Sequence, residues 1–115
     1  MKVIIAGGRD FNDYDLLCEK CDKILSRQTE IEIVSGRARG ADQLGEKYAT
    51  MRGYPIKMFP AKWSEHGKQA GYIRNTEMAE YADALIAFWN MESRGTEHMI
   101  DIARENKLKI RIITY

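Results

Sequence analysis

The sequence predicts an α/β protein with a Rossmann-like, three-layer fold, in which helices cover both faces of a five-stranded parallel sheet of order 3-2-1-4-5. Five short apolar runs alternate with four stretches of helical periodicity, and short connections join them. The fourth run is almost entirely apolar, which is typical of a strand buried on both faces of a parallel sheet. Right-handed crossovers between parallel strands favour the doubly wound order. We expect a single domain over residues 1–115, since this length and the 44% of apolar residues suffice for one core.

Three strands and two helices are predicted in the first half of the chain. The strands cover residues 2–6, 31–35 and 55–59. The first helix begins at a cap, Asn12 or Asp13, and runs to about Arg27, because apolar residues recur there at helical spacing. The second helix runs from about Ala41 to Arg52, where a glycine follows as its stop signal.

Two helices and two strands are predicted in the second half, after a long connection. Residues 60–69 form the longest irregular stretch, which contains Trp63. This indole would either stack on a base or pin the stretch in place. The helices cover about 70–81 and 95–106, and the strands 84–89 and 109–113. Since the run 84–89 is the most apolar, we expect it in the interior of the sheet.

Three loops rich in glycine, serine or arginine follow predicted strands and directly precede helices, at residues 7–10, 36–42 and 90–96. In a doubly wound sheet, ligands bind outside the carboxyl ends of the strands where the strand order reverses. That reversal lies between the first and fourth strands, and the second strand lies beside the first. We therefore expect the three loops to converge on one pocket.

The composition of these loops is typical of a site for a phosphate-bearing ligand. Glycines let the backbone approach a ligand closely, helix starts offer unpaired N–H groups, and arginines supply charge-assisted hydrogen bonds. Tight turns with solvated arginines are the alternative interpretation of any single loop. The loop residues expected to bind the ligand are Gly7, Gly8, Arg9, Ser35, Gly36, Arg37, Arg39, Gly40, Asp42, Ser93, Gly95 and Thr96.

Neither of the common nucleotide motifs is complete. The chain has no G-x-x-x-x-G-K-[ST] loop, which disfavours ATP-driven phosphoryl transfer. Residues 7–12 lack the third glycine of G-x-G-x-x-G, which disfavours standard dinucleotide binding. Asp10 and Asp42 stand at helix starts, where a carboxylate serves as a cap or, in the alternative interpretation, binds ribose hydroxyls.

The overall composition excludes several classes of protein. A net charge of +1 gives no general attraction to nucleic acid or membranes. No run approaches the roughly 18 apolar residues of a membrane span and no signal peptide is apparent, so we expect a cytoplasmic protein without a membrane partner. Cys18 and Cys21 have C-x-x-C spacing but fall in a helical pattern, and His66 and His98 are isolated. We expect inert thiols, with a redox pair as the weaker alternative, and neither a metal site nor a cofactor.

Motifs along nearly the whole chain occur together in one known family. They are G-G-R-D-F at 7–11, V-S-G-x-A-R-G-A-D at 34–42, P-A-x-W at 60–63, G-x-x-R-N-x-x-M at 71–78, A-D-A-L-I-A-F-W at 82–89 and S-x-G-T-x-H-M-I at 93–100. In this order they resemble the YspA-like, cpYpsA-related branch of the SLOG superfamily, which is found in bacteria and phages. Arg37 departs from the pattern, because relatives commonly carry a second glycine there.

The resemblance implies a Rossmann-like fold that binds nucleotides or nucleotide-derived ligands, and a homodimer as in other members of the superfamily. It also adds Arg74 and Asn75 to the expected ligand-binding residues, because their motif is similar to the R-K-x-x-M helix of the LOG phosphoribohydrolases. Met99 stands where the catalytic glutamate of that branch belongs, and a thioether cannot transfer protons. The LOG reaction therefore cannot be carried over to this chain, whereas another enzymatic role stays open. The candidate catalytic residues are Arg74, Glu97, Asp10 and Asp42.

The loop Ser35–Asp42 is also similar to the S-G-G-A-R-G-I-D loop of the DNA-processing protein A family, whose members bind single-stranded DNA. This chain lacks the broad basic or aromatic groove that such binding usually needs, so nucleic acid is not the expected partner. The preferred hypothesis is a domain that binds a nucleotide or a nucleotide-derived small molecule, with sensing of that ligand as one form of this role. The alternatives are hydrolysis of an N-glycosidic or phosphoribosyl bond in that ligand and binding of single-stranded nucleic acid.

Overall fold

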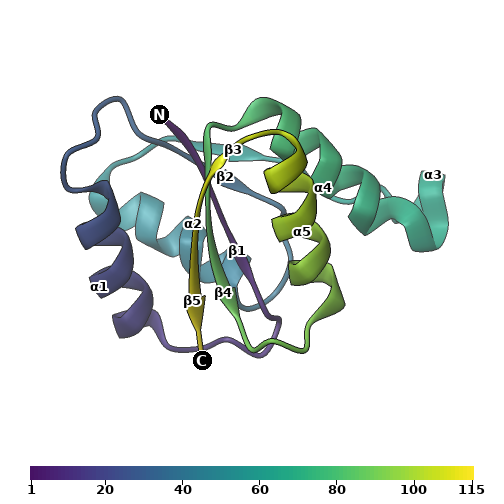
Figure 1. Ribbon diagram of the computed structural model, residues 1–115, viewed down its shortest axis with the longest axis horizontal. Coiled ribbons are helices and arrows are strands. Elements are labelled where there is room, and N and C mark those ends of the chain that lie inside the picture. The colour runs from purple at the N-terminus through teal and green to yellow at the C-terminus, as the bar shows by residue number, and fades with distance from the viewer.

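Five parallel strands form one sheet in the order β3-β2-β1-β4-β5 in the computed structural model, which describes residues 1–115 (Figure 1). The predicted strand order and the parallel pairing are confirmed. β1 and the very apolar β4 pair in the interior of the sheet, from Val3 opposite Ala84 to Gly7 opposite Phe88. The strands are β1 Lys2–Gly7, β2 Glu32–Ser35, β3 Ile56–Met58, β4 Ala84–Trp89 and β5 Lys109–Thr114.

Four helices of 12 residues each connect the strands: α1 Tyr14–Leu25, α2 Ala41–Arg52, α4 Ala70–Tyr81 and α5 Arg94–Glu105. The bounds of α2 and α4 are those predicted, whereas α1 ends two residues before Arg27. Asp13 is the cap of α1, because its Oδ1 accepts a hydrogen bond from the Leu16 N–H at 3.0 Å. Gly53 ends α2 in the left-handed conformation, at φ 75°.

The stretch 60–69 is not irregular throughout, and that part of the prediction was wrong. It contains a one-turn helix, α3 (Trp63–His66), and a 3-10 turn, η1 (Gly67–Gln69). None of the residues in α3 or η1 is buried, so neither element carries the apolar periodicity by which a sequence reveals a helix. In Figure 1, α3 lies at the outer end of α4, away from the sheet.

The helices form two layers, with α1 and α2 on one side of the sheet and α4 and α5 on the other (Figure 1). Alternate residues of β1 enter the two cores. Val3 and Ile5 pack with α1 and α2, and Ile4 and Ala6 pack with α4 and α5. Each fully buried aliphatic side chain contributes about 1.5–3 kcal/mol to the stability of the fold. Because β1 supplies such side chains to both cores, it holds both helix layers on the sheet.

The two cysteines belong to the first of these cores. Cys21 is fully buried on α1, and Cys18 is half-buried one turn earlier; both are free thiols. Burial is the main cause that raises the pKa of the Cys21 thiol to about 12. Cys21 therefore behaves as a small apolar side chain.

The carboxyl ends of β1, β2 and β4 meet where the strand order reverses. The Gly8 N–H donates to the Phe88 carbonyl at 3.1 Å, which ties the loop after β1 to β4. The Ala41 N–H donates to the Gly8 carbonyl at 3.2 Å, which ties the start of α2 to that same loop. The topology thus brings the loops together at one edge of the sheet. None of the helices is both long and apolar enough to cross a membrane.

Candidate functional site

A cavity of about 260 Å³ opens at this edge of the sheet. Residues from all three loops line it, and the first turns of α4 with the α3–η1 segment form a further wall. The lining consists of Ala6, Gly7, Arg9, Ala38, Asp42, Trp63, Lys68, Gly71, Tyr72, Arg74, Asn75, Met78, Ser93, Gly95, Thr96 and Met99. Three of these side chains are cationic and one is a carboxylate, so the cavity favours an anionic ligand.

Arg74 reaches from α4 to the loop after β2. Its Nε donates to Oδ1 of Asn75 at 3.0 Å, and its Nη1 donates to the Gly36 carbonyl. Its Nη2 has no protein acceptor and is therefore available to a ligand. Burial lowers the pKa of Arg74 and the nearby Asp42 opposes that shift, but a guanidinium stays charged.

Asp42 is the only carboxylate that lines the cavity, and only 4% of this residue is exposed to solvent. One oxygen, Oδ2, accepts a hydrogen bond from the Ala38 N–H at 3.3 Å. Burial raises the pKa of Asp42 to about 6, although Arg74 and the backbone hydrogen bonds pull it down. A Cβ on Gly36 would lie 2.8 Å from both Asp42 Oδ2 and Arg74 Nη1, so a larger residue there would displace these two side chains.

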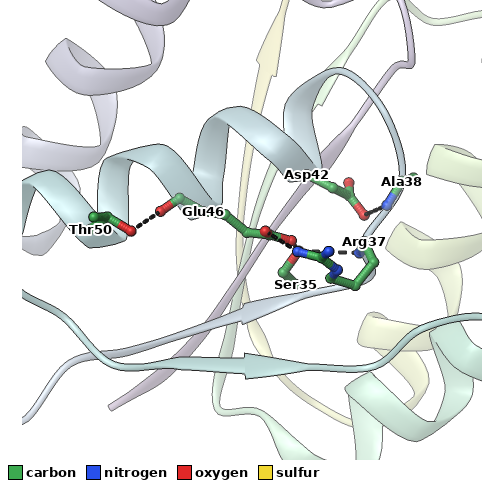
Figure 2. Close-up of polar contacts among 6 residues, drawn as sticks. All are labelled: Ser35, Arg37, Ala38, Asp42, Glu46 and Thr50. Carbon is green, nitrogen blue, oxygen red and sulfur yellow. Dashed lines mark hydrogen bonds and ion pairs between the residues drawn. The ribbon is translucent and has the colours of Figure 1, made fainter.

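The remaining polar groups of the loop after β2 bind one another. Figure 2 shows the Arg37 side chain directed at Glu46 on α2, with which it forms an ion pair. The Ser35 hydroxyl donates to Glu46 Oε2 at 2.5 Å and accepts from the Arg37 N–H at 3.1 Å. Arg39 is solvent-exposed, and neither it nor Arg37 lines the cavity. Ser35 and Arg37 therefore bind other groups of the protein and not the cavity.

The glycines of the first two loops serve their packing. A Cβ on Gly8 would lie 2.0 Å from the Tyr115 hydroxyl, and one on Gly40 would lie 2.3 Å from the Gly8 carbonyl oxygen. The Tyr115 hydroxyl also donates to Asp10 Oδ1 at 2.5 Å. Burial and this hydrogen bond raise the pKa of Tyr115 to about 12, so it stays a donor. Asp10 therefore binds Tyr115, the residue that follows β5, and does not line the cavity.

The start of α5 is more open. Ser93 caps the helix, since its Oγ accepts from the Thr96 N–H at 3.3 Å and from the Thr96 hydroxyl at 3.0 Å. A Cβ on Gly95 would meet nothing within 4 Å, so the cavity side of this turn is free. The N–H groups of Arg94 and Gly95 belong to the first turn, where no helical acceptor exists. Glu97 is exposed and does not line the cavity.

Asn75 joins α4 to α5 and fixes the protonation of His98. The Arg74 Nε can only donate, so the Asn75 atom that faces it is Oδ1. Its Nδ2 then donates to the Gly95 carbonyl at 3.4 Å and faces His98 Nδ1 at 3.2 Å. His98 Nδ1 is therefore an acceptor, and the neutral ring carries its proton on Nε2. Burial lowers the pKa of His98, which favours this neutral form.

Half of the residues singled out from the sequence line the cavity. These are Gly7, Arg9, Asp42, Arg74, Asn75, Ser93, Gly95 and Thr96. Those outside the lining are Gly8, Asp10, Ser35, Gly36, Arg37, Arg39, Gly40 and Glu97.

Sequence reasoning missed Glu46, Lys68 and Tyr72. Tyr72 stands two residues before Arg74 on the same turn of α4, which was a usable signal; nothing in the sequence marked Glu46 as the partner of Ser35 and Arg37. No group of three or more His, Cys, Asp or Glu residues is arranged to hold a metal ion.

Comparison with known proteins gives the family. Residues 1–66 match the family model described as YspA, cpYpsA-related SLOG family. The chain belongs to this family. A relative, Gene 61 protein of Mycobacterium phage D29, is 32% identical over 111 residues, which cover 90% of this chain and 89% of that protein. No solved structure matches the chain. The family expected from the motifs is thereby confirmed, and SLOG membership connects the chain with nucleotide-related function.

Proposed function

We propose that this SLOG protein binds a nucleotide or a nucleotide-derived ligand, with a phosphate group in the cavity between the end of β1, α4 and α5. The observation that carries this proposal is the charge of the lining: Arg9, Lys68 and Arg74 face a single carboxylate, Asp42. The phosphate would accept hydrogen bonds from the free Nη2 of Arg74 and from the open backbone at Gly95. The Arg74 donor makes a charge-assisted hydrogen bond, and the Gly95 backbone lies at the start of a helix, where anions are stabilised.

Asp42 is suited to another part of the ligand. A carboxylate would repel a phosphate group but accepts hydrogen bonds from hydroxyls, such as those of a ribose. Asp42 is buried and lines the same cavity as Arg74, which supports a ligand that has both an anionic group and hydroxyl groups. We therefore assign the ribose to the Asp42 side of the cavity and the phosphate to the α5 side.

Hydrolysis of the bound ligand is the second candidate function, and one observation favours it. Of the three candidate carboxylates, Asp42 alone lines the cavity, and its raised pKa of about 6 suits proton transfer near neutrality. Met99 also lines the cavity but supplies no proton acceptor. An enzymatic step would therefore depend on Asp42, and neither Asp10 nor Glu97 would be required.

The proposed function is tested by thermal-shift and calorimetric measurements with mononucleotides, dinucleotides, ADP-ribose and oligonucleotides. Arg74→Ala should weaken binding of any phosphate-bearing hit about tenfold or more, because it removes a charge-assisted contact. Arg37→Gly is the matched control, since Arg37 pairs with Glu46 outside the cavity and should leave binding unchanged. Equal losses in both variants would disprove the assigned phosphate position. Chromatography of each hit after incubation separates binding from hydrolysis, and Asp42→Asn should abolish any turnover.

A further inference from the structure

We propose that the ligand is a nucleoside monophosphate whose base stacks on Trp63 at the mouth of the cavity. This inference rests on the proposed function and names its ligand class and a residue that determines specificity. The base would lie one ribose away from a phosphate on Arg74. The three observations behind it are the spacing of Trp63 and Arg74, the exposure of Trp63, and the size of the cavity.

The spacing is defined at Gly71, on the first turn of α4. The point that a Cβ would occupy there lies 3.7 Å from Cη2 of Trp63 and 3.8 Å from Nη2 of Arg74. The indole and the free guanidinium nitrogen thus flank the same small space. In a nucleotide, a single ribose separates the base from the 5′-phosphate, so one mononucleotide spans the two side chains.

The exposure of Trp63 is not explained by packing of the segment that carries it. Its residue is 54% exposed, and no residue of α3 or η1 is buried. Tyr72, on the same wall of the cavity, is 41% exposed. The other indole differs, because Trp89 is half-buried and its Nε1 donates to the Ser93 carbonyl at 3.1 Å. Exposed aromatic faces beside a cationic cavity are what recognition of a base and its phosphate requires.

The size of the cavity selects a small ligand. Its volume of about 260 Å³ lies just below the range of roughly 300–1,000 Å³ that is usual for ligand pockets. It accommodates a ribose phosphate, with the base at the mouth against Trp63. Because stacking grows with ring area, a purine should bind more tightly than a pyrimidine on the same indole.

Isothermal titration with AMP, UMP and ribose 5-phosphate tests the inference on the full chain. Trp63→Ala should weaken AMP binding about tenfold and leave ribose 5-phosphate within about twofold, because only the base contacts the indole. Trp63→Phe should restore most of the AMP affinity, since it keeps an aromatic face. Wild-type protein should prefer AMP to UMP. Fluorescence adds a second readout: AMP should quench the wild-type signal but not that of Trp63→Phe, in which Trp89 alone emits.

Each contrary result has a separate meaning. Equal loss of AMP and ribose 5-phosphate affinity in Trp63→Ala, or no loss of either, would refute base stacking while the proposed function stands. Binding of ADP-ribose or a dinucleotide without AMP would likewise refute the mononucleotide class alone. Absence of binding by every phosphate-bearing compound in the wider panel would overturn the proposed function, and this inference with it.

Discussion

The loop after β2, residues 35–42, and the start of α5, residues 93–96, have similar compositions. They differ in that polar groups of the first bind other groups of the protein, whereas the second is open at Gly95. Both follow a strand, contain serine, glycine and arginine, and lead into a helix. In the first, Ser35 and Arg37 bind Glu46, and the Asp42 carboxylate accepts a backbone N–H of the loop itself. In the second, Gly95 faces open space. A loop that holds itself together can therefore have the composition of one that binds a phosphate.

The two regions also differ in what their glycines do. Gly40 has φ 76°, and its missing Cβ makes room for the Gly8 carbonyl. Gly95 has no such neighbour and no positive φ. The first glycine is required by the fold, whereas the second leaves space at the cavity. Substitutions in the two regions should therefore separate stability from ligand binding.

The largest expected effect is that of Gly40→Ala on stability. The added Cβ would meet the Gly8 carbonyl at 2.3 Å and would sit on a left-handed backbone, so we expect a loss of about 3 kcal/mol in the free energy of unfolding. Gly95→Ala is the control and should change that free energy by less than about 0.5 kcal/mol. Urea denaturation of both variants measures the difference. Similar losses would show that the start of α5 is as tightly packed as the loop after β2.

Glu46→Ala should have the next largest effect. It leaves the buried Ser35 hydroxyl without its acceptor and removes the ion pair with Arg37, at a cost of about 2 kcal/mol in unfolding free energy. Ligand affinity should change little, because Glu46 does not line the cavity. Glu97→Ala, an exposed glutamate on α5, is the matched control for stability. A marked loss of affinity in Glu46→Ala would mean that the network around Ser35 positions the ligand as well.

The same contrast explains how far the sequence could be interpreted. The alternation of apolar runs was enough to predict the sheet order, because β1 and β4 are buried on both faces and the crossover rule leaves few arrangements. It could not predict α3, whose four residues are all exposed. Within the site, loop composition identified Arg37, and the resemblance to the LOG motif identified Arg74. Only the three-dimensional arrangement shows that Arg37 meets Glu46 while Arg74 enters the cavity, since these partners lie 9 and 38 residues away in the chain.

Asp42 belongs to both regions, because it closes the loop after β2 and also lines the cavity, and its pH dependence gives the smallest expected effect. Burial raises its pKa from 3.8 to about 6 in the folded protein. The folded state therefore holds a proton that the unfolded state releases, so this group stabilises the fold below about pH 4 and loses that contribution as the pH rises through 6. Between pH 5 and pH 7.5 the loss amounts to about 1 kcal/mol.

Urea denaturation at these two pH values tests this effect. From pH 5 to pH 7.5, the stability of Asp42→Asn relative to the wild type should rise by that amount, since other titrating groups, His98 included, are common to both proteins. Parallel pH profiles would mean that Arg74 holds the carboxylate ionised at its ordinary pKa, which would make Asp42 a fixed anion of the closed loop.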